Sequence, residues 1–297
     1  MKLSTIRAHA LLLLLLTLPV SFCDLANATS LEQIRQRGRI IVGVKKDVLL
    51  WGYQDTANGK IIGMEPDLAQ SIANDLGVKL ELVGVLTAER IDAVKSGQVD
   101  VLIATLSDTP ERQKELDLIA PHYYSSGVNL LTRKTEKFKE WTDLKNRRVC
   151  SRRGAFYNRR VTVTYGADIV ALYSNDWSKQ ALRDGRCAAL LYDDTSIVAM
   201  LRAPEWASDF VMPMTTIFTN PWSIAIAPAE RGGELEKYLS KTVIAWHRNA
   251  HLQQVEKSWG IPASKFLEDM HQIWTKKVDN KWVCGETITA ATPKECL

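Results

Sequence analysis

The segment TPER, residues 109–112, places an arginine near the start of an expected helix. Thr109 is a good N-cap residue, and Pro110 suits the first helical position, so we expect the helix to begin here. Arg112 then lies in the first turn, with its charge against the positive end of the helix dipole. This position calls for a negatively charged partner.

Two kinds of partner are open for Arg112. The first is a local salt bridge with Asp108 or Glu115, both within reach on a helix. The second is a bound anion, held by the guanidinium, the free N–H groups of the helix start and the hydroxyls of Ser107 and Thr105. The second interpretation predicts a binding site for a carboxylate.

The segments that must position these residues alternate between strand and helix patterns. In a first series we expect strands over residues 39–44, 79–85 and 99–106, with helices over 65–77, over 87–97 and from Thr109. In a second series we expect strands over 147–152, 167–173 and 187–193, with helices over 154–163, 176–185 and 194–203. Such alternation predicts parallel sheets covered on both faces by helices.

Two such series predict two α/β lobes, as does a mature chain of about 270 residues. Ligands of open α/β sheets bind beyond the carboxyl ends of the strands. The residues at those ends include Lys45, residues 104–107, Arg153 and Asp193. We therefore expect these polar residues to be functional.

The N-terminus has the pattern of a cleavable signal peptide. Lys2 and Arg7 precede a short apolar run over residues 10–20, and Ala26 and Ala28 have the spacing that signal peptidase reads. We predict cleavage after Ala28 and a soluble, exported, unanchored mature chain. A lipoprotein anchor at Cys23 is the weaker alternative, because a bulky phenylalanine precedes that cysteine.

Charge and cysteine content narrow the class of protein further. Removing residues 1–28 lowers the formal net charge from +4 to +3, which argues against a nucleic-acid binder. The mature chain keeps Cys150, Cys187, Cys284 and Cys296, an even number that suits disulfides in an oxidising compartment but permits three pairings. A zinc site is the weaker alternative, since no C-x-x-C pair occurs, and we expect no metal.

Four segments in the expected order carry a family resemblance: residues 43–83, residues 90–112, GRCAALLYDDT over 185–195 and HLQQVEKSWGI over 251–261. Together they resemble the periplasmic solute-binding proteins of polar amino acid ABC importers, family 3. The resemblance extends to about Ile273 and leaves the tail with Cys284 and Cys296 outside it.

The resemblance implies a type II periplasmic binding protein fold, in which two α/β lobes joined by a two-strand hinge close around a ligand. The expected divisions are a signal peptide over 1–28, a first lobe over 29–124 and 222–268, a second lobe over 125–221 and a tail over 269–297. It also implies a periplasmic monomer that binds a free amino acid, hands it to a membrane permease, needs no cofactor and does no chemistry.

The resemblance assigns Arg112 to the α-carboxylate of the ligand, with Ser107 and Thr105 supplying hydroxyls nearby. A guanidinium suits this role because it donates two parallel hydrogen bonds and keeps its charge. Strand-end capping is the alternative role for both hydroxyls. Asp193 matches the aspartate that accepts hydrogen bonds from the α-amino group, and the adjacent Asp194 is expected to cap the next helix.

One position departs from the family pattern. Gly154 matches a glycine whose following N–H groups meet the carboxylate, but Ala155 and Phe156 stand where members usually carry small hydroxyl residues. Arg152 or Arg153 is expected to compensate.

Trp51 matches an aromatic residue that packs on the ligand, although an isolated tryptophan would more often belong to the core. The surrounding motif favours the ligand contact.

Two further basic residues bear on which amino acid binds. Lys45 and Arg90 stand where members that take glutamate or aspartate carry cations for the side-chain carboxylate, which predicts an acidic ligand. In the alternative, Arg90 pairs with Glu89 or Asp92, Lys45 is solvated, and the ligand is a neutral amino acid such as glutamine or asparagine.

The same fold also hosts enzymes, so a cyclohexadienyl dehydratase-like activity is the main alternative function. Such an enzyme needs a general acid in the cleft, and no carboxylate beyond Asp193 stands out in the sequence. A receptor's sensory domain is disfavoured, because no transmembrane pattern follows residue 28.

Within this fold we expect disulfides Cys150–Cys187 and Cys284–Cys296. The first would link two second-lobe strands, and the second would close a short loop in the tail.

Overall fold

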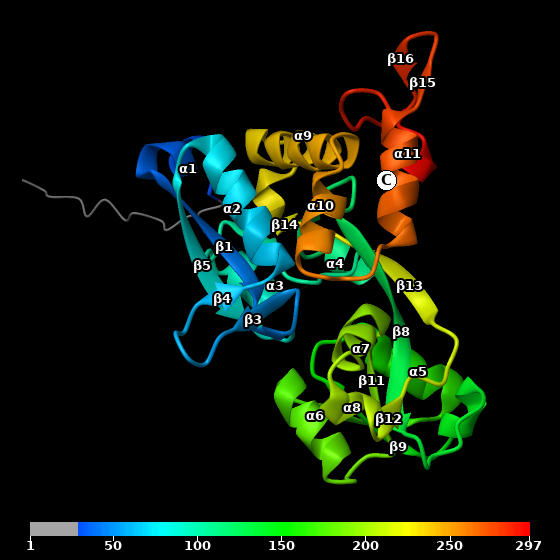
Figure 1. Cartoon of the computed structure of the whole chain (residues 1–297). Coiled ribbons are helices and arrows are strands. Elements are labelled where there is room, and N and C mark those ends of the chain that lie inside the picture. The colour runs from blue at the N-terminus through cyan, green and yellow to red at the C-terminus, as the bar shows by residue number, and fades with distance from the viewer. Residues whose placement is uncertain (1–28) are drawn as a thin grey trace, which may run out of the picture.

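The computed structural model describes residues 29–297 and contains two α/β lobes, each built on its own sheet (Figure 1). The predicted signal peptide lies outside the described residues. Within 29–297, no helix combines the length and apolar character needed to cross a membrane.

The first lobe has a five-stranded sheet in the order β5-β1-β6-β14-β7. The strands are β5 (Lys79–Val85), β1 (Arg39–Lys45), β6 (Val101–Ile103), β14 (Ala225–Ile226) and β7 (Asp117–Leu118). The helices of this lobe are α1 (Leu31–Arg37), α2 (Met64–Leu76), α3 (Arg90–Lys95), α4 (Pro110–Gln113), α9 (Glu234–Arg248) and α10 (His251–Ser258), with the 3₁₀ turn η2 (Pro228–Glu230). β1 pairs in parallel with both β5 and β6, so their carboxyl ends meet at one edge, as expected.

The second lobe has a six-stranded sheet in the order β10-β9-β11-β8-β12, with β13 also paired to β8. The strands are β10 (Asp168–Leu172), β9 (Arg148–Arg152), β11 (Ala189–Asp193), β8 (Tyr124–Arg133), β12 (Phe210–Val211) and β13 (Ile217–Trp222). The helices are α5 (Tyr157–Tyr165), α6 (Asn175–Arg183), α7 (Asp194–Met200) and α8 (Pro204–Ala207), with the 3₁₀ turn η1 (Trp141–Leu144). β9, β10 and β11 are parallel, which brings a second set of carboxyl ends together.

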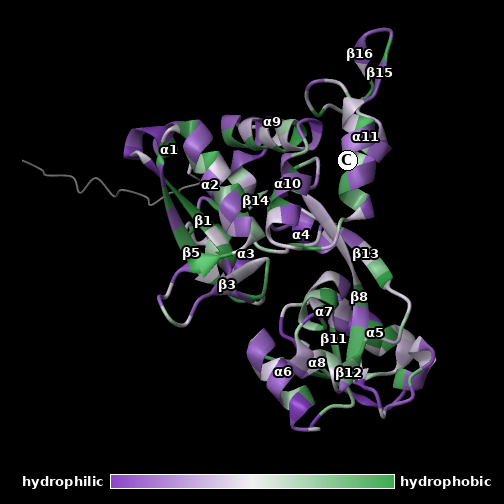
Figure 2. Cartoon of the chain, in the orientation of Figure 1, coloured by the Kyte–Doolittle hydropathy of each residue, from purple (hydrophilic) through white to green (hydrophobic). Residues whose placement is uncertain are grey.

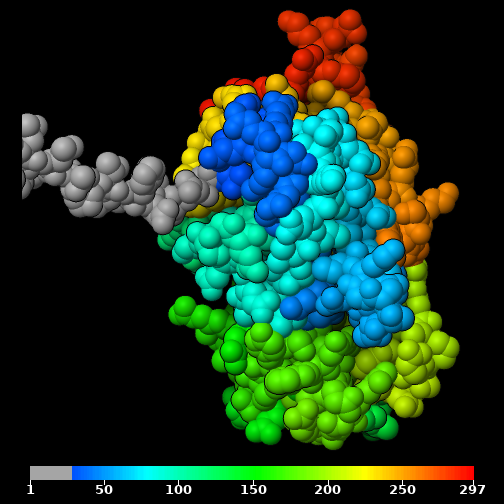
Figure 3. Space-filling view, turned by 90° about the vertical axis from the view of Figure 1, so that its left-hand side faces the viewer, coloured from blue at the N-terminus to red at the C-terminus, as the bar shows by residue number. Residues whose placement is uncertain are grey.

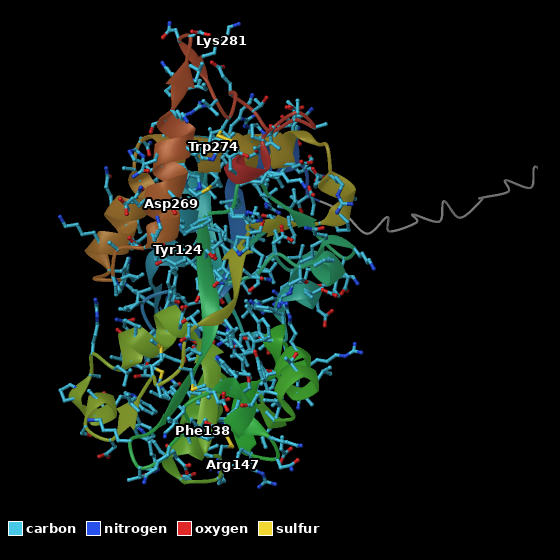
Figure 4. The ribbon with its side chains drawn as sticks, turned by 90° about the vertical axis from the view of Figure 1, so that its right-hand side faces the viewer. Tyr124, Phe138, Arg147, Asp269, Trp274 and Lys281 are labelled. Carbon is cyan, nitrogen blue, oxygen red and sulfur yellow. A yellow bond between two sulfur atoms is a disulfide. The ribbon has the colours of Figure 1, made fainter. Side chains whose placement is uncertain are left out.

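Two antiparallel strands, β8 and β13, connect the lobes. Their register runs from Tyr124 opposite Trp222 to Val128 opposite Ile217, with an irregularity between Ile217 and Asn220. Figure 4 shows β8 running from Tyr124 in the first lobe into the second lobe, whose far end carries Phe138. The prediction of two lobes on a two-strand hinge is therefore confirmed.

Local sequence signals account for several element ends. Gly77 adopts φ 67° directly after α2, a left-handed conformation that glycine tolerates best. The Thr109 side chain accepts a hydrogen bond from the Arg112 N–H, as expected of an N-cap, although α4 is only one turn long.

The colouring in Figure 2 shows apolar residues along the sheet strands and polar residues on the outer faces of the helices.

Other parts of the fold were not expected from the sequence. Three short strands, β2 (Asp47–Val48), β3 (Gly52–Gln54) and β4 (Ile61–Ile62), form a small sheet after β1. Helix α11 (Lys265–Thr275) runs across the boundary that we placed after residue 268.

A hairpin of β15 (Lys277–Val278) and β16 (Lys281–Trp282) follows α11, and the 3₁₀ turn η3 (Lys294–Cys296) lies near the end of the chain. Figure 4 shows Lys281 at the outer tip of this hairpin, away from the second lobe.

Candidate functional site

Polar residues from the carboxyl ends of both sheets meet between the lobes. Arg112 of the first lobe donates from Nη2 to the Gly154 carbonyl of the second, over 3.3 Å. Asn175, at the start of α6, donates its backbone N–H to Asp47 Oδ2 in the first lobe, over 3.0 Å. Figure 3 shows the cyan surface of the first lobe resting directly on the green surface of the second. The lobes are therefore in contact around the candidate site.

Arg112 lies at this junction and is 6% exposed. Its Nη1 donates to the Ser107 carbonyl over 2.7 Å, which fixes the guanidinium beside the end of β6. Burial and the nearby Arg152 charge lower the pKa of Arg112 to about 10, which leaves it a cation at neutral pH. The site thus holds a buried, positioned guanidinium.

The local salt bridge considered for Arg112 is absent from residues 29–297. Asp108 instead lies 2.8 Å from His122 Nε2, and Glu115 pairs with Lys95 over 3.2 Å. Both acids therefore have other partners, and the buried Arg112 cation has no carboxylate bonded to it in the described part of the chain.

Asp193 ends β11 and is buried on the opposite lobe. Its Oδ2 forms an ion pair with Arg152. The guanidinium carbon of Arg152 lies 4.4 Å from the Tyr192 ring centroid, and its Nη1 lies 3.4 Å from Asn175 Oδ1. Of the two arginines that we expected to compensate for missing hydroxyls, Arg152 lies inside the site. The Arg153 side chain is exposed, because side chains alternate along the strand and its end, and its contact with a ligand stays a prediction.

The neighbouring acid, Asp194, has a structural role that differs from the expected one. Asp193, not Asp194, occupies the N-cap position of α7 and makes no capping bond. Asp194 accepts hydrogen bonds from Ser126 Oγ (2.7 Å), Gly127 N (3.1 Å) and Thr216 Oγ1 (3.0 Å). It therefore ties α7 to the strands of the hinge.

Lys45 ends β1 and is fully buried. Its Nζ lies 2.9 Å from Asp47 Oδ1 and donates to Thr87 Oγ1 over 3.0 Å. Burial lowers its pKa to about 8, against the opposing effect of Asp47. The alternative of a solvated Lys45 is wrong.

Arg90 is 2% exposed at the start of α3. Its guanidinium donates to three backbone carbonyls, those of Thr87 (2.9 Å), Ala104 (2.9 Å) and Thr105 (2.7 Å). No ion pair joins Arg90 to Glu89 or Asp92 within residues 29–297, so that alternative is wrong too. Burial, followed by the charges of Arg112 and Arg152, lowers the pKa of Arg90 to about 9.

Glu65 is a buried carboxyl group beside the site that the sequence analysis missed. Its Oε1 accepts hydrogen bonds from the Thr105 N–H and the Tyr123 hydroxyl, each over 2.6 Å. These bonds hold Thr105 at φ 46°, while the Thr105 hydroxyl is buried without a partner among residues 29–297. Burial raises the pKa of Glu65 to about 8, so it is mostly protonated at neutral pH. No local signal in the sequence marked Glu65 as buried, because an acid in the first turn of a helix is usually exposed.

Gly154 lies where the second lobe contacts the first. It adopts φ +80°, and a Cβ atom there would lie 2.9 Å from the Ala88 Cα of the first lobe. Only glycine fits this conformation and this contact without strain. The helix that we expected to begin at Gly154 begins at Tyr157, and the carbonyl of Gly154 meets Arg112.

Ser107 and Trp51 lie on the first-lobe side. Ser107 is buried and pairs its backbone with Trp222 at the hinge. Trp51 is fully buried, with its ring 4.5 Å from that of Tyr124 and 4.7 Å from that of Trp222. Trp51 thus packs in the first-lobe core near the hinge, and its contact with a ligand stays a prediction.

Comparison with known proteins agrees with this architecture. A model of the bacterial extracellular solute-binding proteins, family 3, matches residues 40–283. This chain belongs to that family. The match confirms the resemblance drawn from the motifs and, like it, leaves Cys284 and Cys296 outside.

Relatives of this family 3 protein differ in the ligands that their names state. A glutamine-binding protein of Geobacillus stearothermophilus is 37% identical over 123 residues, which cover 40% of this chain and 47% of that protein. An L-glutamate/L-aspartate-binding protein of Pseudomonas aeruginosa is 23% identical over 262 residues, covering 84% of this chain and 85% of that protein.

A solved structure is similar in fold. It is the ancestral amino acid-binding protein described as a precursor of cyclohexadienyl dehydratase, with a TM-score of 0.68 and 24% identity, covering 77% of this chain and 98% of that one.

The site of the family 3 protein carries an excess of buried positive charge. Its four cations are Lys45, Arg90, Arg112 and Arg152, and its two carboxylates in ion pairs are those of Asp47 and Asp193. Four positive and two negative charges leave an excess of two, because Glu65 is mostly protonated. Among residues 29–297, no group of three His, Cys, Asp or Glu residues is arranged to hold a metal ion. The site is therefore suited to an anionic ligand.

A cleft of about 840 Å³ opens onto this site beside Arg112 and Gly154. Its walls come from both lobes: Asp108, Thr109 and Pro110 from the first, and Ala155, Phe156 and Arg159 from the second. Of the four buried cations, Arg112 lines this cleft, so a small molecule can reach its guanidinium.

Both predicted disulfides are present in this family 3 protein. Cys150 pairs with Cys187 in the second lobe, and Cys284 pairs with Cys296 in the tail.

Proposed function

We propose that this protein captures a free acidic amino acid, glutamate or aspartate, between its lobes and delivers it to an ABC importer in the inner membrane. In this proposal the mature chain is a periplasmic monomer that binds without chemistry. The observation that carries the proposal is the excess of two positive charges buried at the junction of the lobes. A ligand with two carboxylates and one ammonium group offsets part of that excess, whereas a cationic amino acid would be repelled.

The ligand's backbone groups have partners on opposite lobes. Arg112 receives the α-carboxylate, because its guanidinium is buried, positioned by Ser107 and without a carboxylate of its own in residues 29–297. Asp193 receives the α-ammonium group beside Arg152. A zwitterion held in this way bonds to both lobes and so favours the closed arrangement.

Lys45 and Arg90 receive the side-chain carboxylate. Both are buried on the first lobe, and burial strengthens their attraction for an anion. Their hydrogen bonds to Thr87 and to backbone carbonyls also fit a purely structural role, which would leave a neutral amino acid such as glutamine as the ligand. The ligand's charge is therefore the quantity to measure.

An enzyme on the same fold is the second candidate, and one observation favours it. Glu65 is a protonated, buried carboxyl group within hydrogen-bond distance of Thr105, and its Oε2 has no partner among residues 29–297. A carboxyl group that stays protonated at neutral pH can act as a general acid. Dehydration of prephenate by the purified protein, abolished in Glu65→Gln, would favour this second function.

The deciding experiment is calorimetric titration of protein refolded after removal of any bound ligand, against all free amino acids. We expect glutamate or aspartate to bind at least tenfold more tightly than its amide, roughly 1.4 kcal/mol. Arg90→Ala should erase this preference. Arg39→Ala is a matched control, because Arg39 is half exposed and pairs only with Glu81, over 3.6 Å. Equal or tighter binding of the amide would refute an acidic ligand.

A further inference from the structure

Tyr157 is a buried residue of the second lobe that the proposed binding scheme does not use. It is the first residue of α5 and follows Ala155 and Phe156, the two residues that replace the hydroxyl side chains usual in the family. Its side chain is 1% exposed. The ring packs in the second-lobe core, with its centroid 5.2 Å from that of Phe156.

The hydroxyl of Tyr157 donates no hydrogen bond to any of residues 29–297, although the Arg152 guanidinium lies beside it. A buried hydroxyl without a partner costs free energy, so proteins rarely retain one without a reason. The Nε of Arg152 is unpaired in the same way, and the Arg152 guanidinium carbon lies 5.8 Å from the Tyr157 ring centroid. Two unused donors therefore lie close together on the second lobe.

Arg152 connects these donors to the proposed site, because its Nη2 forms the ion pair with Asp193. Gly154, three residues before Tyr157 in the chain, accepts the hydrogen bond from Arg112 Nη2. Burial raises the pKa of Tyr157, so the phenol stays protonated and is a hydrogen-bond donor. The Tyr157 hydroxyl is therefore a buried donor next to Arg152 and close in the chain to the contact between Gly154 and Arg112.

We infer that Tyr157 is a ligand-binding residue whose hydroxyl donates a hydrogen bond to the α-carboxylate held by Arg112. It supplies from one position later in the chain the second-lobe donor that Ala155 and Phe156 lack. Arg112 belongs to the first lobe and Tyr157 to the second, so a carboxylate bonded to both would join the lobes. This inference rests on the proposed function, because it needs a carboxylate ligand at Arg112.

The test is the variant Tyr157→Phe, which removes the hydroxyl and keeps the buried ring. We expect its affinity for the amino acid that binds the wild type to fall about tenfold to a hundredfold, the usual effect of losing a hydrogen bond to a charged group. The stability of the ligand-free protein should stay the same or rise, because the lost hydroxyl had no partner. Tyr165→Phe is the matched control, since Tyr165 ends the same helix and packs against Trp141, 5.6 Å between ring centroids.

A second probe identifies the bonded group. The α-carboxamide of the same amino acid lacks the charged acceptor, so Tyr157→Phe should weaken its binding much less. If Tyr157→Phe binds with wild-type affinity, the inference about Tyr157 is overturned and the proposed function stands. An affinity loss accompanied by an equal loss of ligand-free stability would have the same consequence. Failure of the wild type to bind any free amino acid would overturn the proposed function and, with it, this inference.

Discussion

Arg112→Ala is the substitution that tests the proposed site most directly. The wild-type guanidinium is buried, and it donates to the carbonyls of Ser107 (2.7 Å) and Gly154 (3.3 Å) but to no carboxylate within residues 29–297. Removing it should therefore affect the ligand-free fold and ligand binding to different extents.

The effect on the fold should be small. Each lost hydrogen bond from the charged guanidinium to a carbonyl is worth about 1.5–3 kcal/mol, and much of this is regained because the desolvation cost of a buried cation near Arg152 disappears. We expect the free energy of unfolding of the ligand-free protein to change by no more than about 2 kcal/mol.

The effect on binding should be large. A desolvated carboxylate that loses its partner costs about 3–5 kcal/mol, which is roughly a hundredfold to a few thousandfold in affinity. Arg112→Lys should lie between the wild type and the alanine variant, because an ammonium group keeps the charge but not the two parallel donors.

Isothermal titration calorimetry measures the affinities, and denaturant unfolding without ligand measures the stability. Arg147→Ala is the control, because Arg147 lies at the far end of the second lobe (Figure 4), where it pairs with Glu136 over 2.7 Å. An affinity of Arg112→Ala within threefold of the wild type would refute the assignment of Arg112 to the ligand.

Two further predictions concern stability. Burial raises the folded-state pKa of Glu65 to about 8, above its ordinary value of 4.5, so the free energy of unfolding should fall by about 1.4 kcal/mol per pH unit as pH rises through that interval. Glu65→Gln should remove this fall in denaturant titrations from pH 5 to 8. Parallel curves for the two proteins would contradict the prediction. Replacing both cysteines of Cys150–Cys187 by alanine should destabilise the protein by about 4 kcal/mol, against about 3 kcal/mol for Cys284–Cys296, because the closed loops span 37 and 12 residues. Neither cysteine pair lines the cleft, so a change in ligand affinity in the tail variant would count against this placement of the site.

The order of strands and helices was predictable from the sequence, because it depends on local periodicity. Apolar runs such as residues 39–44 and 79–85 form strands where expected, and Gly77 ends its helix. The N-cap of Thr109 also followed from local chemistry, since its partner is the N–H three residues later. The cysteine pairing also followed from the sequence, because Cys150 and Cys187 lie in two expected second-lobe strands and Cys284 and Cys296 close a short loop in the tail.

The partners of the charged residues were decided by the tertiary structure. Asp108 and Glu115 are close to Arg112 in sequence, yet they do not pair with it. The fold brings His122 to Asp108 and Lys95 to Glu115 instead. Arg152 and Arg153 are adjacent and identical in type, and only the direction of the side chain from β9 puts Arg152 beside Asp193.

Burial was likewise invisible in the sequence at the residues that matter most for the proposed chemistry. Glu65 reads as an ordinary acid in the first turn of a helix, and Tyr157 as one aromatic residue among several. The environment of Glu65 comes from segments distant in the chain, because Thr105 and Tyr123 bond to it, and Tyr157 lies beside the Arg152 guanidinium at the end of β9. Local periodicity fixes which segments become strands and helices, whereas the electrostatic environment of a side chain depends on long-range packing, which only the folded chain defines.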